Sequence, residues 1–231
     1  AFTIVTAATG PIVTDGTLLT PPAASERKLL VFGDSITAGY GVEGASKECS
    51  YSHDTSTARK AYAMLAADKL NADIHVIAWS GIGVWRSYGE QMPTNPTMRA
   101  RFNRALADNP EAPWQPSQYT PDAIVINLGT NDFWTGSSEG YATAMADFLA
   151  SVQARYPSAP VYLMASPMLW GDSRNAQVQV LKSLAKGKVQ FFDAGGIEQA
   201  DGLGCDYHPN LTTQTRLAAR LASKLSQDLG W

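Results

Sequence analysis

The chain has 231 residues, 45% of them hydrophobic, and a formal net charge of −3. This length and apolar content predict one folded α/β domain and exclude a disordered chain. We expect no membrane span and no signal peptide, because no apolar run approaches ~18 residues and no charged-then-apolar leader opens the chain. The acidic balance argues against a nucleic-acid partner, and the low charged fraction of 17% favours a secreted or periplasmic protein.

Residues 1–27 are predicted to form an N-terminal extension and linker before a domain that spans residues 28–231. Residues 1–13 mix β-forming residues with glycine and proline, and Thr20 precedes two prolines that would stiffen the chain. The segment is too short for a domain of its own. It is either a β-ribbon laid on the body or the tail of a preceding module.

Short apolar runs alternate with segments of helical periodicity along the rest of the chain. The runs are residues 28–32, 73–79, 123–128, 160–165 and 189–193, and the helical segments are residues 57–70, 97–107, 139–155, 175–186 and 211–229. Apolar runs without strict alternation are typical of strands that are buried on both faces. The pattern therefore predicts a three-layer α/β/α domain with a five-stranded parallel sheet, whose ligands bind at the carboxyl ends of the strands.

The residues that follow these strands carry the parts of an acyl-transfer site. Ser35 comes just after the first run, at the expected start of a helical turn, and Gly81 and Asn131 follow the second and third runs. His208 precedes the last helix. A serine nucleophile, a histidine base and three hydrogen-bond donors (the Ser35 and Gly81 amides and the Asn131 side chain) together make the machinery of ester hydrolysis.

These residues lie in four blocks: G-D-S ending at Ser35, the glycine Gly81, G-T-N-D containing Asn131, and D-Y-H ending at His208. Their order and intervals resemble the SGNH/GDSL hydrolases over residues 28–231. The resemblance implies a flavodoxin-like fold, catalysis by Ser35 and His208, and an oxyanion hole formed by Ser35, Gly81 and Asn131. It implies neither a cofactor nor a metal ion.

Longer stretches, residues 33–43, 77–83, 125–133 and 204–210, are similar to carbohydrate esterase family 2. That resemblance implies a serine esterase that removes O-acetyl groups from xylan or related carbohydrates. The chain departs from the family in having only about 27 residues where those enzymes carry a β-domain. It also has D-x-H where the superfamily has D-x-x-H, so either the Asp206 carboxylate or a backbone carbonyl orients His208.

Two other motifs receive structural interpretations. G-x-S-x-G at residues 136–140 would be a nucleophile elbow only directly after a strand, so we expect Ser137 or Ser138 to cap a helix instead. G-x-G-x-x-G at residues 39–44 does not close a strand and predicts a flexible loop rather than a nucleotide site. Asp34 and Asp132 are expected to accept hydrogen bonds from turn amides.

The remaining candidates concern the rim of the site and the cysteines. Trp134 and Tyr207 are predicted to bind substrate, since aromatic residues gather near the expected site. Cys49 and Cys205 lie in polar stretches, and a disulfide between them remains open. No metal-binding motif occurs. The rival functions are a short-chain lipolytic esterase or thioesterase with the same site, and a non-catalytic carbohydrate-binding module. No oligomeric state is predicted.

Overall fold

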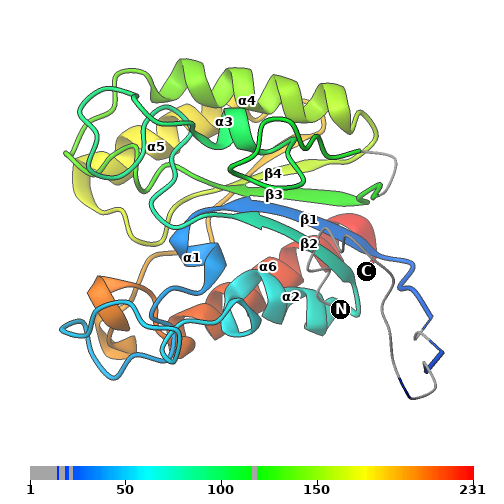
Figure 1. Cartoon of the computed structure of the whole chain (residues 1–231), viewed down its shortest axis with the longest axis horizontal. Helices are drawn as coiled ribbons and strands as arrows, with labels where there is room; N and C mark the ends of the chain where they lie inside the picture. The colour runs from blue at the N-terminus through cyan, green and yellow to red at the C-terminus, as the bar shows by residue number, and fades with distance from the viewer. Residues whose placement is uncertain (1–14, 16–18, 21–22, 116–118) are drawn as a thin grey trace.

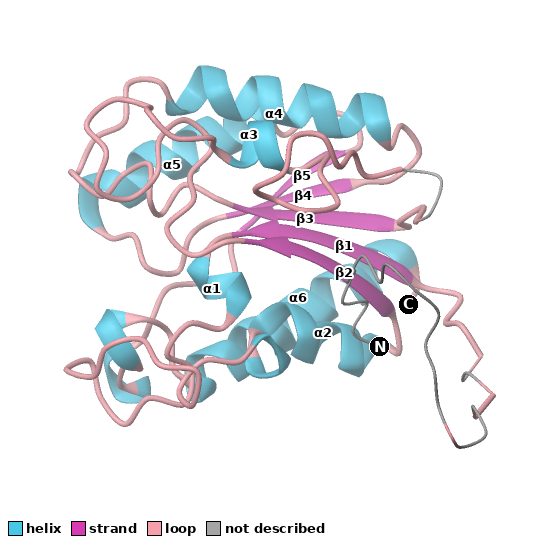
Figure 2. Ribbon diagram, in the orientation of Figure 1, coloured by secondary structure: helices cyan, strands magenta, loops and turns pink. Residues whose placement is uncertain are grey.

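The computed structural model describes residues 15, 19–20, 23–115 and 119–231 (Figures 1 and 2). Its five parallel strands form one sheet in the order β2-β1-β3-β4-β5, the doubly wound order of flavodoxin-like folds. The strands are β1 (Lys28–Gly33), β2 (Asp73–Ala78), β3 (Ala123–Asn127), β4 (Val161–Met164) and β5 (Val189–Phe192). The α-helices are α1 (Ser35–Ala38), α2 (Tyr62–Leu70), α3 (Met98–Arg101), α4 (Tyr141–Arg155), α5 (Gly171–Leu184) and α6 (Leu211–Leu229).

Helices cover both faces of the sheet, which confirms the predicted α/β/α architecture. Figure 1 shows α2 and α6 on one face and α3, α4 and α5 on the other. Successive residues of β1 point to opposite faces, so Leu30 and Phe32 join the cluster under α4, and Leu29 and Val31 join the cluster under α2 and α6. Strands β1, β3 and β4 are buried on both faces, as the continuous apolar runs predict, whereas every residue of the edge strand β2 is half-buried.

The last helix has the boundaries that its leucine spacing predicts. Leu217, Leu221 and Leu225 are fully buried on one stripe of α6, as expected when apolar residues recur every four positions. The Asn210 side chain accepts a hydrogen bond from the Thr213 amide at 3.2 Å, an N-cap that satisfies one otherwise unpaired amide of the first turn. This cap lies two residues after His208, and the helix begins at the next residue, Leu211.

A buried glutamine joins α6 to the helix that begins with Ser35. The Gln214 side chain accepts a hydrogen bond from the Tyr62 amide at 2.8 Å and donates one to the Ile36 carbonyl at 3.0 Å. A buried amide group that lost these partners would carry an unpaired polar atom, at a cost of about 1–3 kcal/mol. Gln214 thus ties the C-terminal helix to α1 and α2.

The predicted helix at residues 97–107 is wrong beyond its first turn. Helix α3 ends at Arg101, and the chain then turns back so that the Ala105 amide donates to the Ala112 carbonyl at 2.7 Å. Met98 and Phe102 are buried, but Leu106 is exposed. The apolar stripe therefore stops after one turn. A longer helix would bury no further apolar side chain to offset the backbone entropy that it loses.

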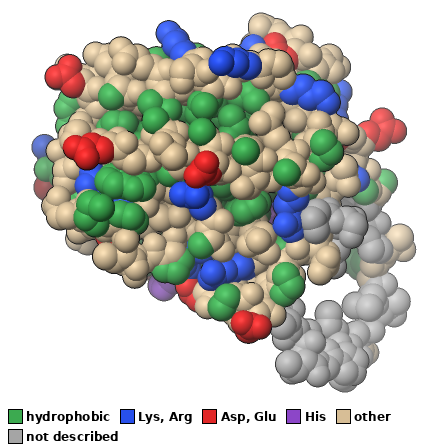
Figure 3. Space-filling view, turned by 90° about the horizontal axis from the view of Figure 1, so that it is seen from above, with side chains coloured by type: hydrophobic (Ala, Val, Ile, Leu, Met, Phe, Trp, Pro, Cys, Tyr) green, Lys and Arg blue, Asp and Glu red, His purple; other side chains and the backbone are tan. Residues whose placement is uncertain are grey.

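The other boundaries differ less from the prediction. Residues 57–70 form a 3-10 turn (Ala58–Lys60) followed by α2, and α5 begins four residues earlier than predicted, at Gly171. The β-ribbon considered for residues 1–13 lies outside the described residues. Within the described part of the chain, no helix has the length and apolarity that crossing a membrane requires. On the face seen from above in Figure 3, basic and acidic side chains are interspersed among apolar ones.

Candidate active site

Ser35 lies where β1 ends and α1 begins. The Asp34 carboxylate caps this short helix, accepting a hydrogen bond from the Ile36 amide at 2.9 Å, as the sequence predicts. Burial raises the pKa of Asp34 to about 6. As a first-turn residue, Ser35 has a backbone N–H without an intrahelical acceptor, and its side chain lies at the carboxyl edge of the sheet.

His208 meets Ser35 although 173 positions separate them in the chain. Its Nε2 atom lies 2.8 Å from Ser35 Oγ. Its Nδ1 atom lies 3.0 Å from the Asp206 carbonyl oxygen and 3.2 Å from the Cys205 carbonyl oxygen. Because carbonyl oxygens only accept, this arrangement selects the tautomer with hydrogen on Nδ1 and leaves Nε2 free to accept the serine proton. Burial lowers the pKa of His208 below its usual value.

The Asp206 carboxylate does not contact His208 Nδ1. It accepts a hydrogen bond from the Tyr40 hydroxyl instead. Asp206 and Tyr207 both have left-handed backbones, with φ of 48° and 63°, a conformation that L-residues adopt at a cost. This turn brings two carbonyls to the imidazole, so the interaction at Nδ1 is the backbone alternative of the two considered for D-x-H.

A disulfide between Cys49 and Cys205 resolves the question that the sequence left open. It joins the loop after α1 to the turn that carries His208, and the Asp206 amide also donates to the Cys49 carbonyl at 2.9 Å. Gly41 and Gly44 make room for this crossing: a Cβ on Gly41 would lie 2.8 Å from Cys205 Cβ, and one on Gly44 would collide with Cys205 Sγ. In the G-x-G-x-x-G match, Gly41 and Gly44 thus pack against the disulfide, and Gly39 packs against the Thr57 backbone.

The two predicted donors from other strands lie at neighbouring strand ends. In the sheet register Gly33 pairs with both Ala78 and Asn127, so the chain after each strand emerges beside Ser35. The buried Asn131 side chain donates to the Ile82 carbonyl at 2.8 Å, which fixes its amide orientation and leaves a second N–H. Gly81 has φ of 80°, a conformation that favours glycine.

Asp132 joins the loop after β3 to the loop after β2. Its carboxylate accepts hydrogen bonds from the amides of Val84, Trp85 and Arg86, the closest at 2.7 Å. The Arg86 guanidinium donates back to the Asp132 carbonyl at 3.0 Å. Burial raises the pKa of Asp132 to about 6, although the hydrogen bonds from the three amides lower this pKa. The predicted amide contacts are present, but they span two loops and so couple Gly81 to Asn131.

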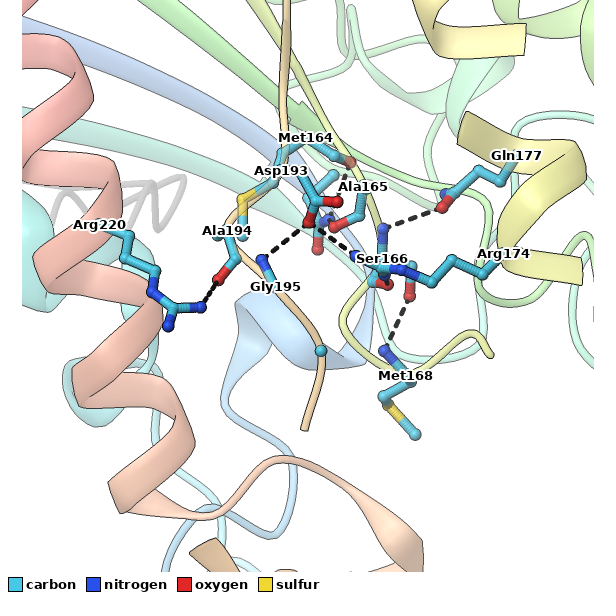
Figure 4. Close-up of polar contacts among 12 residues, drawn as sticks. Met164, Ala165, Ser166, Met168, Arg174, Gln177, Asp193, Ala194, Gly195 and Arg220 are labelled. Atoms are coloured by element: carbon cyan, nitrogen blue, oxygen red, sulfur yellow. Dashed lines mark hydrogen bonds and ion pairs between the residues drawn. The ribbon is translucent and has the colours of Figure 1, made fainter. Parts of the chain in front are cut away.

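A second polar network supports the loop after β3 from the side of β4 and β5 (Figure 4). Ser166 Oγ lies 2.7 Å from Thr130 Oγ1, and the Ser166 amide donates to the Gln177 side chain at 3.0 Å. Arg174 donates to the Ser166 carbonyl at 2.7 Å and pairs with Asp193 at 2.6 Å. Sequence reasoning missed these residues, because serine, glutamine and arginine on different elements share no local motif.

Aromatic residues lie in the loops after β2 and β3 and in the turn before His208. The Trp134 indole donates to the Glu90 carbonyl at 2.9 Å, and its ring centroid lies 5.4 Å from that of Tyr88. Tyr88 is 68% exposed, and Tyr207, next to His208, is 60% exposed. Sequence reasoning missed Tyr88; its place seven residues after Gly81, in the loop that follows β2, was the available signal.

The G-x-S-x-G match does not form a nucleophile elbow. Ser137 and Ser138 lie in a loop well after β3, and α4 begins at Tyr141 without a side-chain cap, so the predicted serine cap is also absent. The Ser137 carbonyl instead accepts a hydrogen bond from Arg86 at 2.6 Å. Among the described residues, no three or more His, Cys, Asp or Glu side chains are grouped to hold a metal ion.

Comparison with known proteins identifies the family. Residues 31–225 match the model of the GDSL-like Lipase/Acylhydrolase family. The chain is 34% identical to a family two carbohydrate esterase from Clostridium thermocellum solved in complex with cellohexaose, with a TM-score of 0.88, over 94% of this chain and 69% of that one. It is 35% identical to a carbohydrate esterase family 2 enzyme from Corynascus thermopiles (Myceliophthora fergusii), with a TM-score of 0.86, over 96% and 72%.

Two curated relatives agree with the structures. Cellulase/esterase CelE of Acetivibrio thermocellus is 36% identical over 94% of this chain, which spans 27% of that protein. An acetylxylan esterase / glucomannan deacetylase of Cellvibrio japonicus is 29% identical over 94% of this chain, which spans 61% of that protein. The protein is therefore a member of the GDSL-like lipase/acylhydrolase family and, within it, of the family 2 carbohydrate esterases.

Proposed function

We propose that the protein is a serine esterase that removes O-acetyl groups from carbohydrates, with residues 28–231 as its catalytic domain. The observation that carries this proposal is the 2.8 Å contact between His208 Nε2 and Ser35 Oγ, with Nδ1 held by backbone carbonyls. The names of the relatives support acetylated carbohydrate as the substrate class.

In the first step Ser35 Oγ attacks the acetyl carbonyl carbon while His208 Nε2 takes the serine proton. The Ser35 amide, the Gly81 amide and the Asn131 side chain donate to the oxygen that becomes negative. The Cys205 and Asp206 carbonyls stabilise the imidazolium through its Nδ1–H. The tetrahedral intermediate then collapses: the ester C–O bond breaks, and the sugar oxygen leaves with the proton from His208.

In the second step water attacks the acetyl group on Ser35. His208 accepts one proton from the water and returns it to Ser35 Oγ as the acyl-enzyme bond breaks, which releases acetic acid. The base thus works without a carboxylate at Nδ1, because two backbone dipoles supply the orientation that a triad carboxylate otherwise gives.

Acetylated xylan, acetylated glucomannan, monosaccharide acetates and the butyryl esters of the same sugars test the proposal with wild type and Ser35→Ala. We expect acetate release by wild type, a higher kcat/KM on acetyl than on butyryl esters, and loss of turnover in Ser35→Ala. A preference for butyryl or longer esters would contradict deacetylation in favour of a lipolytic esterase. Binding of the sugars without acetate release would indicate a carbohydrate-binding module.

Tyr88, Trp134 and Tyr207 are proposed to contact the sugar. Their rings are large and amphipathic, and Tyr88 and Tyr207 are more than half exposed. Trp134→Ala and Tyr88→Ala should raise KM for acetylated oligosaccharide and leave KM for 4-nitrophenyl acetate unchanged, because the small ester has no sugar ring to stack. An equal change in KM for both substrates would contradict this role.

The protein is further proposed to be secreted or periplasmic. The Cys49–Cys205 disulfide supports this localisation, since disulfides persist mainly in oxidising compartments. Detection of the oxidised protein only in the cytoplasm of its source cells would contradict the proposal.

A further inference from the structure

Tyr40 contacts both residues that carry out the proposed chemistry, Ser35 through its backbone and His208 through its ring. It follows α1 directly after Gly39, and its amide donates to the Ser35 carbonyl at 3.0 Å. Its ring stacks on the His208 imidazole, with centroids 4.2 Å apart and planes 25° apart. Its hydroxyl donates to Asp206, the residue whose carbonyl holds His208 Nδ1. One side chain therefore touches the base and the turn that orients the base.

These contacts are not those of an ordinary core residue. Tyr40 belongs to neither hydrophobic cluster of the described residues, and its other aromatic neighbour is Tyr51, with ring centroids 5.3 Å apart. Burial and the Asp206 carboxylate raise the pKa of Tyr40 to about 12. Its hydroxyl therefore remains a hydrogen-bond donor throughout the pH range in which an ester can be assayed.

We propose that Tyr40 is a positioning residue for His208: its ring holds the plane of the imidazole and excludes water from one face, and its hydroxyl holds the Asp206 turn. The inference rests on the proposed function. A displacement of a reacting group by about 1 Å costs ~10²-fold in rate, so looser positioning of the imidazole should lower kcat measurably.

The test compares Tyr40→Ala with Tyr40→Phe on 4-nitrophenyl acetate and on an acetylated sugar. We expect Tyr40→Ala to lower kcat by about 10- to 10²-fold with little change in KM. It should also move the acid limb of the pH–kcat/KM profile upward, because burial lowers the pKa of His208 and the variant admits water. Tyr40→Phe keeps the stacked ring and should restore most of kcat and the wild-type acid limb.

Tyr51→Ala is the matched control, since the Tyr51 ring contacts the rings of Tyr40 and His53 rather than that of His208. A purely structural role predicts a lower melting temperature for Tyr40→Ala with wild-type kcat and pH profile in the folded fraction, and this result would overturn the inference. So would an equal loss of kcat in Tyr51→Ala. Absence of esterase activity in wild type would instead refute the proposed function, so the two failures are distinguishable.

Discussion

The strand-end half of the candidate site, with Ser35, Gly81 and Asn131, is held by the sheet, whereas the turn that carries His208 lies outside the sheet. The first half follows from the parallel register of β1, β2 and β3 and from the amides that Asp132 collects. The second half depends on a disulfide, on Tyr40 and on a left-handed turn. Loss of a single side-chain contact should therefore displace the turn that carries His208 more than it displaces the strand ends.

This difference has a physical basis. A strand end is positioned by many cooperative hydrogen bonds, so no single side chain decides where Ser35 lies. The turn at Asp206 and Tyr207 has an unfavourable conformation. It is joined to the loop after α1 by the amides of Cys205 and Asp206 and by the disulfide, so loss of one of these cross-links should loosen it. Substitutions at strand ends should change chemistry, and substitutions around the turn should change both the orientation of His208 and stability.

The largest expected effect is that of removing the base. His208→Ala should lower kcat by about 10⁶-fold, as loss of the serine or histidine does in a comparable hydrolase, because among the described residues no other side chain is hydrogen-bonded to Ser35 Oγ. Stopped assays of acetate release measure it. His53→Ala, in an exposed loop, is the control and should retain wild-type kcat; a small loss in His208→Ala would contradict the assignment.

Loss of the Asn131 donor should have the next largest effect. Asn131→Ala should lower kcat by about 10²–10³-fold, the usual cost of one oxyanion-hole donor. Asn131→Asp is the matched variant, because it keeps the shape but replaces the amide donor with a carboxylate, and it should be at least as impaired. An Asn131→Ala enzyme with wild-type kcat and a raised KM would show that Asn131 binds the sugar instead.

The disulfide should matter for the His208 half of the site. The double variant Cys49→Ala/Cys205→Ala should lose about 2–5 kcal/mol of unfolding free energy, measured by denaturant titration. Its kcat should fall by about 10-fold or more, because the carbonyl of residue 205 no longer has a fixed position. Reduction of wild type should reproduce both losses and leave the double variant unchanged; unaltered kcat in both would indicate that the disulfide serves stability alone.

Asp206→Asn tests whether His208 is oriented by the Asp206 backbone carbonyl or by its carboxylate. Asparagine tolerates the left-handed conformation and can still accept the Tyr40 hydrogen bond, so we expect a loss of about 10-fold or less in kcat. A triad carboxylate would cost about 10⁴-fold. A loss of that size, with an unchanged melting temperature, would show that the carboxylate reaches His208 during turnover.

The sequence allows the strand-end half to be predicted because its determinants are local: a buried run, then a glycine, then a polar side chain, as at Gly33 and Ser35. The turn is different. Whether the Asp206 carbonyl or its carboxylate contacts His208 depends on positive φ values at two non-glycine residues, and no residue pattern encodes these values. Tyr40 and Tyr88 were overlooked for a different reason: their partners, His208 and Trp134, lie on segments distant in the sequence.

The smallest expected effect is a shift of the acid limb of the pH–kcat/KM profile. His208 must be neutral to accept the serine proton, and burial lowers its pKa from the usual value near 6.5. As pH falls and the imidazole becomes protonated, the midpoint of the decline in kcat/KM should therefore lie below pH 6.5. The Asp206 charge raises the pKa of His208, so Asp206→Asn should move the limb to still lower pH. A wild-type limb above pH 6.5 would show that another group controls turnover, and an unmoved limb in Asp206→Asn would show that the Asp206 charge does not contribute to the proton affinity of the base.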